Sequence, residues 1–474
     1  MAVTNTEAAA RAAASAAQVD WEQMEAWDRA YYLHNVQGAE EHVWNGVAYQ
    51  EGNYLYMVDG SRLLDCQSQL ISDNLGHRHP RVVAGLKEAL ERYGHVYFGM
   101  ATDYRARAAK LIVDDLLGVD GWAGRVRILP SGSDAVDVAL TMARVYTGRP
   151  VVLTQQHSFH GLTAGAGTRV RGYNNQLSSA TSPHDVRDVP GGELPTFRTI
   201  PAPEHEDFDG VNGLPSIDAL EQTIAEVGAA NVAAVITETM LGVAGIMSHD
   251  DYIPAVRELT RKHGILWIDD EVICGFGRLG KWFSYQLYDG VLPDLMPIGK
   301  GMNGCILPVG GVVASREIAE VFERDRWYSG STWDGHPLVC ATIVANIEAM
   351  IDEDVVEHGA EMGVRLREGL EEFRSRHPSI GRIGGRGLYQ AVDLVRGDGT
   401  PIVPEDRLFD FTGDLSQTPT RIIARESAKH GVYLTGFVPN TIKVAPPLTV
   451  TPDEIDLTLE AFDAGLDEVE RAYH

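Results

Sequence analysis

The stretch PDLMPIGKGMNG, residues 293–304, combines an apolar run with a lysine that stands between two glycines. The apolar residues predict a buried strand, and such a strand normally ends in a polar turn with its charged groups in water. Lys300 is flanked by Gly299 and Gly301, which let a partner approach the backbone closely. Two interpretations follow from this stretch alone: an ordinary surface turn, or a lysine that reaches inward to bind a partner covalently.

The bulk composition excludes several classes of protein. The chain has 474 residues, 44% of them hydrophobic, which is long enough for two or three domains. The formal net charge of -27 argues against a nucleic-acid-binding protein, and no Lys/Arg cluster predicts binding to an anionic membrane. No apolar run is long enough to cross a bilayer.

The cysteines and the N-terminus indicate where the protein works. The four cysteines stand far apart without metal-type spacing, which predicts reduced thiols in a cytoplasmic protein and no metal site. The Ala-rich residues 1–18 lack the charged and apolar regions of a secretory signal. They predict a frayed tail or a loose helix.

Short apolar runs alternate with helical patterns through the middle of the chain. This alternation predicts an α/β fold with a mostly parallel central sheet flanked by helices. The strands are expected at residues 125–129, 151–154, 233–237, 265–269 and 309–314. Residues 337–373 form one long helical pattern that leads to a smaller α+β unit, with which we expect the early strands to pack. The predicted domains are an N-terminal segment 1–85, a large domain 86–340 and a small domain 341–474.

Polar groups follow two of the predicted strands. The sequence PSGSDA places Gly132 and Ser133 at the start of a helix, where backbone N–H groups can either bind an anion or simply be capped. The sequence IDDEV places Asp269, Asp270 and Glu271 at the end of a buried strand, where ligands of parallel sheets bind. A carboxylate there can hold a protonated ring nitrogen, or it can cap a helix.

The sequence HSFHG, residues 157–161, follows a third strand. Phe159 can stack on a flat ligand, although most phenylalanines are core residues. A phosphate cup, a stacking aromatic, an acid for a ring nitrogen and an inward lysine are together what pyridoxal phosphate (PLP) needs.

These motifs, with the lysine thirty residues after the acid, make the chain resemble the class III (subgroup II) aminotransferases of PLP fold type I. The resemblance covers about residues 30–465 and rests on SGSDA, DEVICGFGRLG, PDLMPIGKGMNG and STWDGHP. It implies a large PLP-binding domain and a smaller α+β domain built from both chain ends. It also implies a homodimer or a tetramer, because the active site of the family is shared between subunits.

The resemblance assigns roles to individual residues. Lys300 corresponds to the lysine that binds PLP covalently, and Asp270 to the partner of the ring nitrogen. Val272 and Phe159 would cover the two ring faces, while Gly132 and Ser133 would bind the phosphate. The remaining cofactor contacts that the resemblance implies are His160, Glu238 and Thr332, the last of these reaching the phosphate of the neighbouring subunit.

Departures from the family bear on the substrate. Relatives that use ornithine or 4-aminobutyrate carry a Glu, a Gln and an Arg where this chain has Val243, Ile273 and Lys443. The acid that would pair with the arginine is therefore missing. The lysine at the arginine position is less suited than arginine to bind a carboxylate through two hydrogen bonds. The chain instead resembles the pyruvate-using ω-aminotransferases, which share DEVICGFGR. Lys443 can read a carboxylate or a sulfonate, or it can be a lysine on an exposed strand edge.

The resemblance therefore predicts an enzyme that moves an amino group from a terminal amine, polar or anionic, to a small 2-oxo acid such as pyruvate. Ping-pong kinetics are expected, and Tyr56 and Phe98 are predicted pocket walls beside Lys443. The alternatives are 2-oxoglutarate as acceptor, or an aminomutase, phospho-lyase or decarboxylase of the same fold. A PLP-binding regulator without turnover is disfavoured, because the N-terminus carries no helix-turn-helix pattern and Lys300 and Asp270 are both present.

Overall fold

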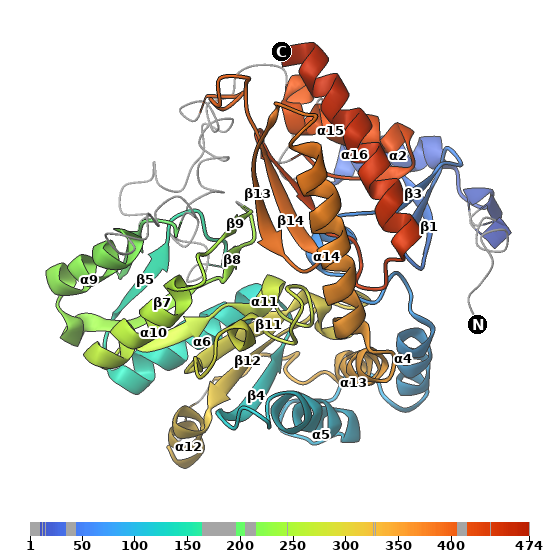
Figure 1. Cartoon of the computed structure of the whole chain (residues 1–474). Helices are drawn as coiled ribbons and strands as arrows, with labels where there is room; N and C mark the ends of the chain where they lie inside the picture. The colour runs from blue at the N-terminus through green and yellow to red at the C-terminus, as the bar shows by residue number, and fades with distance from the viewer. Residues whose placement is uncertain are drawn as a thin grey trace.

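The computed structural model describes residues 10–11, 13–14, 16–34, 44–163, 196–203, 215–243, 245–325, 327, 329–404, 415–436 and 438–473. Residues 1–9 of the predicted N-terminal tail lie outside these ranges. Figure 1 shows a large sheet with helices around it and, above it, a unit built from the C-terminal strands and helices. No helix in the described ranges is both long enough and apolar enough to cross a membrane.

A seven-stranded sheet forms the centre of the large unit, in the order β4-β12-β11-β10-β7-β5-β6. Its strands are β4 (Ala123–Leu129), β5 (Val151–Gln155), β6 (Phe197–Ile200), β7 (Val232–Thr237), β10 (Leu266–Asp269), β11 (Leu295–Gly299) and β12 (Gly310–Ser315). Only β12 runs antiparallel to its neighbours, β4 and β11, while the other four pairings are parallel. The predicted α/β fold class, with its mostly parallel sheet, is therefore confirmed.

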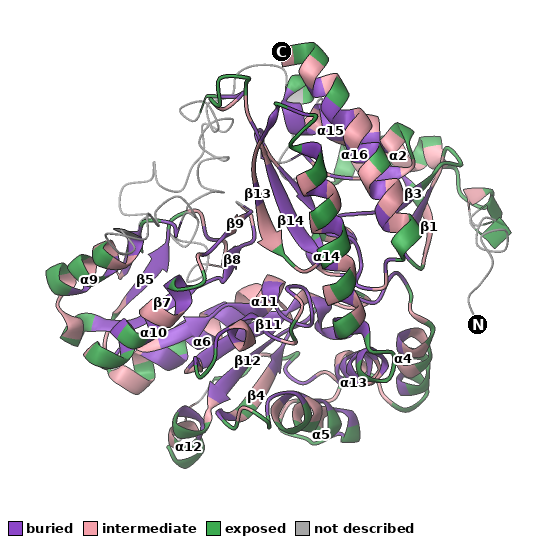
Figure 2. Cartoon of the chain, viewed as in Figure 1, coloured by how far each residue is buried: buried purple, intermediate pink, exposed green. Residues whose placement is uncertain are grey.

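Helices cover both faces of this sheet, as a parallel sheet requires. They are α4 (Pro80–Arg92), α5 (Asp103–Lys110), α6 (Gly132–Thr147), α9 (Pro215–Val227), α10 (Tyr252–His263), α12 (Arg316–Arg324) and α13 (Pro337–Asp352). Every residue of β7 and β11 is buried. Figure 2 shows the same contrast, with the strands mostly buried and the outer faces of the helices exposed. Burial on both faces explains why the strands read as continuous apolar runs.

The smaller unit combines segments from both ends of the chain. It contains the sheets β1-β2-β3-β15 and β13-β14-β16. The elements are β1 (Val47–Glu51), β2 (Tyr54–Met57), β3 (Arg62–Asp65), β13 (Ile380–Arg386), β14 (Tyr389–Leu394), β15 (Val432–Tyr433), β16 (Thr441–Val444), α2 (Trp21–Tyr31), α14 (Val355–Phe373), α15 (Pro419–Lys429) and α16 (Pro452–Tyr473). β3 pairs in parallel with β15, which joins the early strands to the C-terminal segment. The exact domain boundaries stay a prediction.

The long helical pattern at residues 337–373 is two helices, which corrects the expectation of one. α13 ends at Asp352 and α14 begins at Val355. Between them Asp354 adopts a left-handed backbone with φ of 49°. A non-glycine residue in this conformation breaks a right-handed helix. The apolar periodicity continues across the break, so it could not reveal it.

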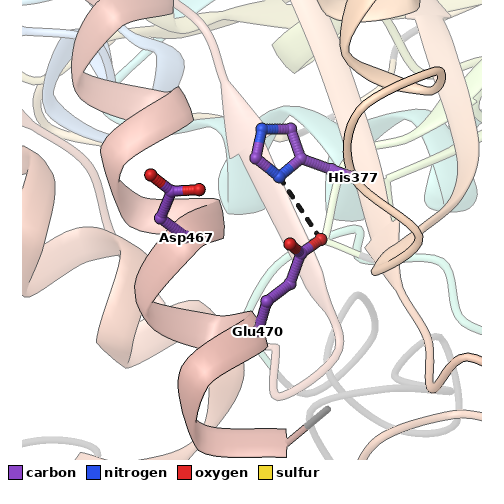
Figure 3. A group of neighbouring side chains, drawn as sticks. All are labelled: His377, Asp467 and Glu470. Carbon is purple, nitrogen blue, oxygen red and sulfur yellow. Dashed lines mark hydrogen bonds and ion pairs between the residues drawn. The ribbon is translucent and has the colours of Figure 1, made fainter.

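A buried histidine fastens α16 to the chain that follows α14 (Figure 3). His377 pairs through Nδ1 with Glu470 at 3.3 Å and through Nε2 with Asp463 at 2.8 Å. The Ser379 hydroxyl also donates to Glu470, at 2.8 Å. His377, Asp467 and Glu470 lie close enough together to hold a cation. Because both ring nitrogens already bond to carboxylates, the cluster stabilises helix packing.

Candidate active site

The candidate residues gather at the carboxyl edge of the central sheet. Glu238 follows β7, Asp270 follows β10 and Lys300 follows β11. Gly132 begins α6 just after β4, whose direction matches that of β11. Residues from four distant parts of the sequence therefore meet at one edge, which is where ligands of open α/β sheets bind.

Lys300 is the first residue of the turn after β11 and is partly buried. Its Nζ donates to the backbone oxygen of Leu70 at 2.8 Å, so the side chain points inward and the surface-turn interpretation is wrong. Burial lowers the pKa of Lys300 to about 8, although the charges of Glu238 and Asp270 act in the opposite direction. A lysine amine with a lowered pKa is a better nucleophile at neutral pH.

Asp270 is buried and makes two kinds of contact. Its Oδ1 accepts from the backbone N–H of Val272 at 3.0 Å, so it caps the short helix α11 (Glu271–Cys274). Its Oδ2 lies 2.5 Å from Nδ1 of His160. The Nε2 of His160 is buried and has no hydrogen-bond partner among the described residues. Asp270 therefore serves as a helix cap and still presents its second oxygen, shared with His160, to the site.

The two acids beside Asp270 have different environments. Glu271 accepts from the Ser284 hydroxyl at 2.6 Å and from the backbone N–H of Tyr285 at 3.2 Å. Burial raises the pKa of Glu271 to about 7 and raises the pKa of Asp269 well above its usual range. Of the three acids, Asp270 is thus the one that pairs with a histidine of the site, while Glu271 holds a neighbouring turn.

The start of α6 packs closely against Val272 and the HSFHG segment. A Cβ added to Gly132 would lie 2.9 Å from Cγ1 of Val272, and one added to Gly161 would lie 2.5 Å from Oγ of Ser133. Ser133 Oγ accepts from the backbone N–H of Leu162 at 3.1 Å. Glycine is therefore required at Gly132 and Gly161 for close approach. The contacts bring the helix N-terminus, Val272 and the segment containing Phe159 together.

Glu238 connects three parts of the site. Its Oε1 accepts from the backbone N–H of Phe159 at 2.8 Å and its Oε2 from that of Gly242 at 2.9 Å. Its own N–H donates to Oε1 of Gln155 at 2.9 Å. Burial raises the pKa of Glu238 to about 7, with the charge of Asp270 acting in the same direction and His160 opposing it.

Lys443 lies in β16 and is only 8% exposed, so the exposed-edge interpretation is wrong. Its Nζ donates to the backbone oxygens of Val243 at 3.1 Å and Gly242 at 3.3 Å. These oxygens belong to the turn between β8 (Met240–Leu241) and β9 (Ile246–Met247). Burial, with the charge of Lys300 adding to it, lowers the pKa of Lys443 to about 8. The lysine therefore donates to the backbone of Val243, the position at which the resemblance places an acid in the ornithine and 4-aminobutyrate enzymes.

The turn that contacts Lys300 has an unusual backbone. The residues of the turn α3 (Ser68–Ile71) all have positive φ, from 44° to 62°. For non-glycine residues this costs about 1–2 kcal/mol each. Asp65 holds the turn, because it accepts from the backbone N–H groups of Gln67 and Gln69, both at 3.1 Å. Such strain persists only where the surroundings fix the backbone, and here it presents the Leu70 oxygen to Lys300.

His77 anchors the same segment between two buried carboxylates. Its Nε2 lies 3.1 Å from Asp65 and its Nδ1 lies 2.8 Å from Asp73. Burial alone lowers the pKa of His77, but the hydrogen bonds to Asp65 and Asp73 outweigh it and raise the pKa to about 9. The imidazolium is therefore the expected form at neutral pH.

This raised pKa predicts a pH-dependent contribution to stability. Because the folded pKa exceeds the unfolded value, the contribution is complete below pH 6.5 and is lost as the pH rises through about 9. It amounts to roughly 3 kcal/mol at most, at 1.36 kcal/mol per pKa unit. The melting temperatures of the wild type and His77→Asn should thus differ most below pH 6.5 and converge towards pH 9. A difference that does not change with pH would contradict this assignment.

Three predicted residues are not joined to this group by the contacts of the described chain. Thr332 is exposed in the turn before α13. Phe98 packs beside Tyr97, with ring centroids 4.5 Å apart. Tyr56 is buried in β2 beside Tyr49, with ring centroids 6.1 Å apart. Their roles stay predictions.

The sequence did not point to some groups that the fold places in the site. The Leu70 oxygen and the Gly242 N–H and oxygen belong to the backbone, which carries no residue-type signal. Gln155 had a weak signal, since it is a polar residue at the end of β5. The same signal, a polar residue at the end of a strand, predicted Asp270, because ligands of parallel sheets bind at the carboxyl ends of the strands.

The residues present fit PLP. The buried Nε2 of His160 lacks a partner, and Asp270 beside it offers a carboxylate for a ring nitrogen. Gly132 is the first residue of α6, where backbone N–H groups suit a phosphate, and Val272 provides an apolar surface in close contact with it. With Phe159, whose backbone N–H donates to Glu238, the inward Lys300 completes the four features that the resemblance requires.

Comparisons with known proteins agree with this geometry. The sequence profile of the family described as aminotransferase class-III matches residues 37–466. The putrescine–pyruvate aminotransferase of Pseudomonas aeruginosa is 33% identical over 438 residues, covering 89% of this chain and 90% of that protein.

Solved structures give the same result. An S-selective transaminase from Bacillus megaterium superposes with a TM-score of 0.90 at 39% identity, covering 96% of this chain and 99% of the other. A taurine:2-oxoglutarate aminotransferase from Bifidobacterium kashiwanohense, in complex with PLP and glutamate, gives 0.85 at 28% identity, covering 96% and 99%. The chain therefore belongs to the class-III aminotransferases, PLP-dependent enzymes that act on an amine donor and a keto acid acceptor.

Proposed function

We propose that this aminotransferase moves the amino group of a terminal amine or ω-amino acid, polar or anionic, to a small 2-oxo acid such as pyruvate. The observation that carries the donor class is Lys443, a buried lysine whose Nζ donates to the backbone oxygens of Val243 and Gly242 and whose pKa is lowered by burial and by the charge of Lys300. A buried ammonium favours a substrate that brings negative or polar groups to it. The pyruvate acceptor is supported by the name of the P. aeruginosa relative.

The residues of the chain divide the work as follows. PLP, when bound, supplies an electron-accepting ring and a covalent link for amines. Asp270, held by His160 and by the Val272 N–H, would keep a proton on the ring nitrogen. Lys300 would take the proton from the substrate carbon that carries the amine, as general base, and would deliver it to the cofactor carbon, as general acid. Gly132 and Ser133 would hold the phosphate at the N-terminus of α6, and Phe159 and Val272 would cover the ring faces.

The overall reaction has two halves. The donor leaves its nitrogen on the enzyme and departs as a carbonyl compound before the 2-oxo acid enters and departs as an amino acid. Ping-pong kinetics follow, because the two substrates use the same site in turn.

An absorbance experiment tests the proposal. The PLP-loaded protein is mixed with a panel of primary amines without any acceptor, and the visible band of lysine-bound PLP is followed. We expect polar or anionic amines to discharge the band and pyruvate to restore it. If 2-oxoglutarate restored the band and pyruvate did not, the acceptor would be 2-oxoglutarate instead of pyruvate. A band that no amine discharges would favour a mutase, lyase or decarboxylase instead.

Lys443 supplies a prediction about selectivity. Removing its charge while keeping its length, as in Lys443→Met, should raise KM for anionic donors by about 10–100-fold, the value of a charged hydrogen bond of 1.5–3 kcal/mol. The KM for neutral amines should change little, and Lys443→Arg should retain anionic donors. The exposed Lys281→Met is the matched control. Equal KM changes for neutral and anionic donors would show that Lys443 does not read substrate charge.

We also propose that the protein is a homodimer, with Thr332 reaching the phosphate site of the other subunit. The support is that Thr332 lies beside exposed aromatic residues. Trp333 is 53% exposed and Tyr97 is 55% exposed, and Trp333 packs against His95 with ring centroids 4.8 Å apart. Grouped exposed aromatic side chains mark protein contact surfaces. The mass in solution, measured by light scattering, tests this.

The cytoplasmic location also stays a proposal. Its support is that Cys66, Cys274, Cys305 and Cys340 are all unpaired. Unpaired thiols are typical of a reducing compartment.

A further inference from the structure

A cavity of about 410 Å³, lined by none of the candidate active-site residues, lies between the end of β9 with the residues after it and the C-terminal unit. Four arginines line it: Arg367 in α14, Arg374 just after α14, and Arg382 and Arg386 in β13. Met247 and Asp250 also line it. A cavity of this size can hold a small molecule. In a chain with a net charge of -27, such a concentration of guanidinium groups is unexpected from composition.

The carboxylates near these arginines do not match them in number. Glu371 pairs with both Arg367 and Arg374, at 2.9 and 2.6 Å. Asp393 pairs with Arg382 at 2.7 Å. Asp250 pairs with Arg386 at 3.4 Å. Three carboxylates therefore face four guanidinium groups, and the Arg386 pair is long and exposed.

Several guanidinium N–H groups of these arginines remain available to bind a ligand. Within the described chain, Nη2 of Arg374, Nη1 of Arg382 and Nη2 of Arg386 donate no hydrogen bond to a protein atom. By contrast, all three nitrogens of Arg367 donate to protein groups, so Arg367 is structural. Guanidinium groups bind carboxylate and phosphate oxygens in pairs, with charge-assisted hydrogen bonds.

The cavity also touches the hairpin that carries the Lys443 contacts. Arg382 Nη2 donates to the backbone oxygen of Gly245 at 3.3 Å. Lys443 binds the oxygens of Gly242 and Val243 in the same turn. The arginine cluster and the candidate active site therefore hold the same short hairpin through different contacts.

We propose that this arginine-lined cavity is a binding site for a small dianion that carries carboxylate or phosphate oxygens. Arg374, Arg382 and Arg386 supply the hydrogen bonds, and the excess positive charge supplies the attraction. The site is separate from the one that holds PLP, so it does not depend on which substrates the enzyme uses.

Calorimetric titration of the PLP-loaded protein tests the proposal. Inorganic phosphate and citrate are titrated separately at constant ionic strength, so that screening does not differ between them. Keeping PLP bound fills the phosphate site at α6. We expect saturable binding of at least one probe with one site per chain. Binding of phosphate alone would indicate a phosphorylated ligand, and binding of citrate alone a carboxylate ligand.

Substitutions locate the site. Arg386→Gln and, separately, Arg374→Gln should weaken binding at least about tenfold, since a charged hydrogen bond is worth 1.5–3 kcal/mol. Arg365→Gln is the matched control, because Arg365 lies on α14 but pairs with Asp456 and does not line the cavity. Melting temperatures verify that the variants fold. Absence of saturable binding by both probes, or equal affinity in wild type and both cavity variants, would overturn the proposal.

Discussion

Replacing Lys300 with alanine is expected to abolish transamination, with a loss in kcat of about 10⁴-fold or more, the upper range for a general acid–base group. The reason is that Lys300 is the inward amine at the candidate site and has its pKa lowered to about 8 by burial. We propose that Lys300 also forms the covalent link to the cofactor. In the described part of the chain, the other buried lysine of the site, Lys443, cannot readily replace it, because its Nζ donates to the oxygens of Gly242 and Val243.

Single-turnover spectra and borohydride reduction measure this. Wild-type protein should keep the cofactor on the peptide that contains Lys300 after reduction, and Lys300→Ala should not. Lys300→Arg keeps a positive charge without the nucleophile and should be as inactive as alanine. Lys281→Ala, at an exposed lysine, should behave as wild type. Covalently fixed cofactor in Lys300→Ala would show that another residue binds PLP.

Replacing Asp270 with asparagine should lower kcat by about 10²–10³-fold, the usual effect of removing one preorganised electrostatic group. Asparagine keeps the size of the side chain and can still accept from the Val272 N–H, so the cap of α11 survives. It removes the negative charge that, in the proposed role of Asp270, keeps a proton on the cofactor ring. The protein should therefore bind PLP with a shifted absorbance band and react slowly with amines.

Asp269 offers a matched control for this substitution. Burial, with the nearby Glu271 adding to it, raises the pKa of Asp269 well above its usual range, which disfavours the charged form of this side chain. Asp269→Asn changes the same kind of buried side chain one residue away and should leave kcat within a few-fold of wild type. Equal losses of kcat in the two variants would indicate a general effect on packing. They would contradict the role proposed for Asp270.

Local patterns in the sequence were sufficient to predict the strands of the central sheet and the types of residue in the candidate site. The predicted strands at 125–129, 151–154, 233–237, 265–269 and 309–314 all appear in the central sheet, because strands buried on both faces read as apolar runs and the edge strand β4 alternates apolar with polar residues. The order strand, acid, strand, lysine also placed Asp270 and Lys300 at the same edge. The resemblance of the motifs was sufficient to identify the family.

Tertiary structure alone decided the points that depend on distant segments. Lys443 read equally well as an exposed edge residue, and only the packing of the β8–β9 turn over β16 buries it. Lys300 meets the Leu70 oxygen, which is 230 positions away and is held in a strained turn by Asp65. The sequence by itself determined which side chains this protein can use for chemistry. The fold decided which backbone groups meet them, because burial and long-range contacts are properties of the packed chain and leave no local pattern.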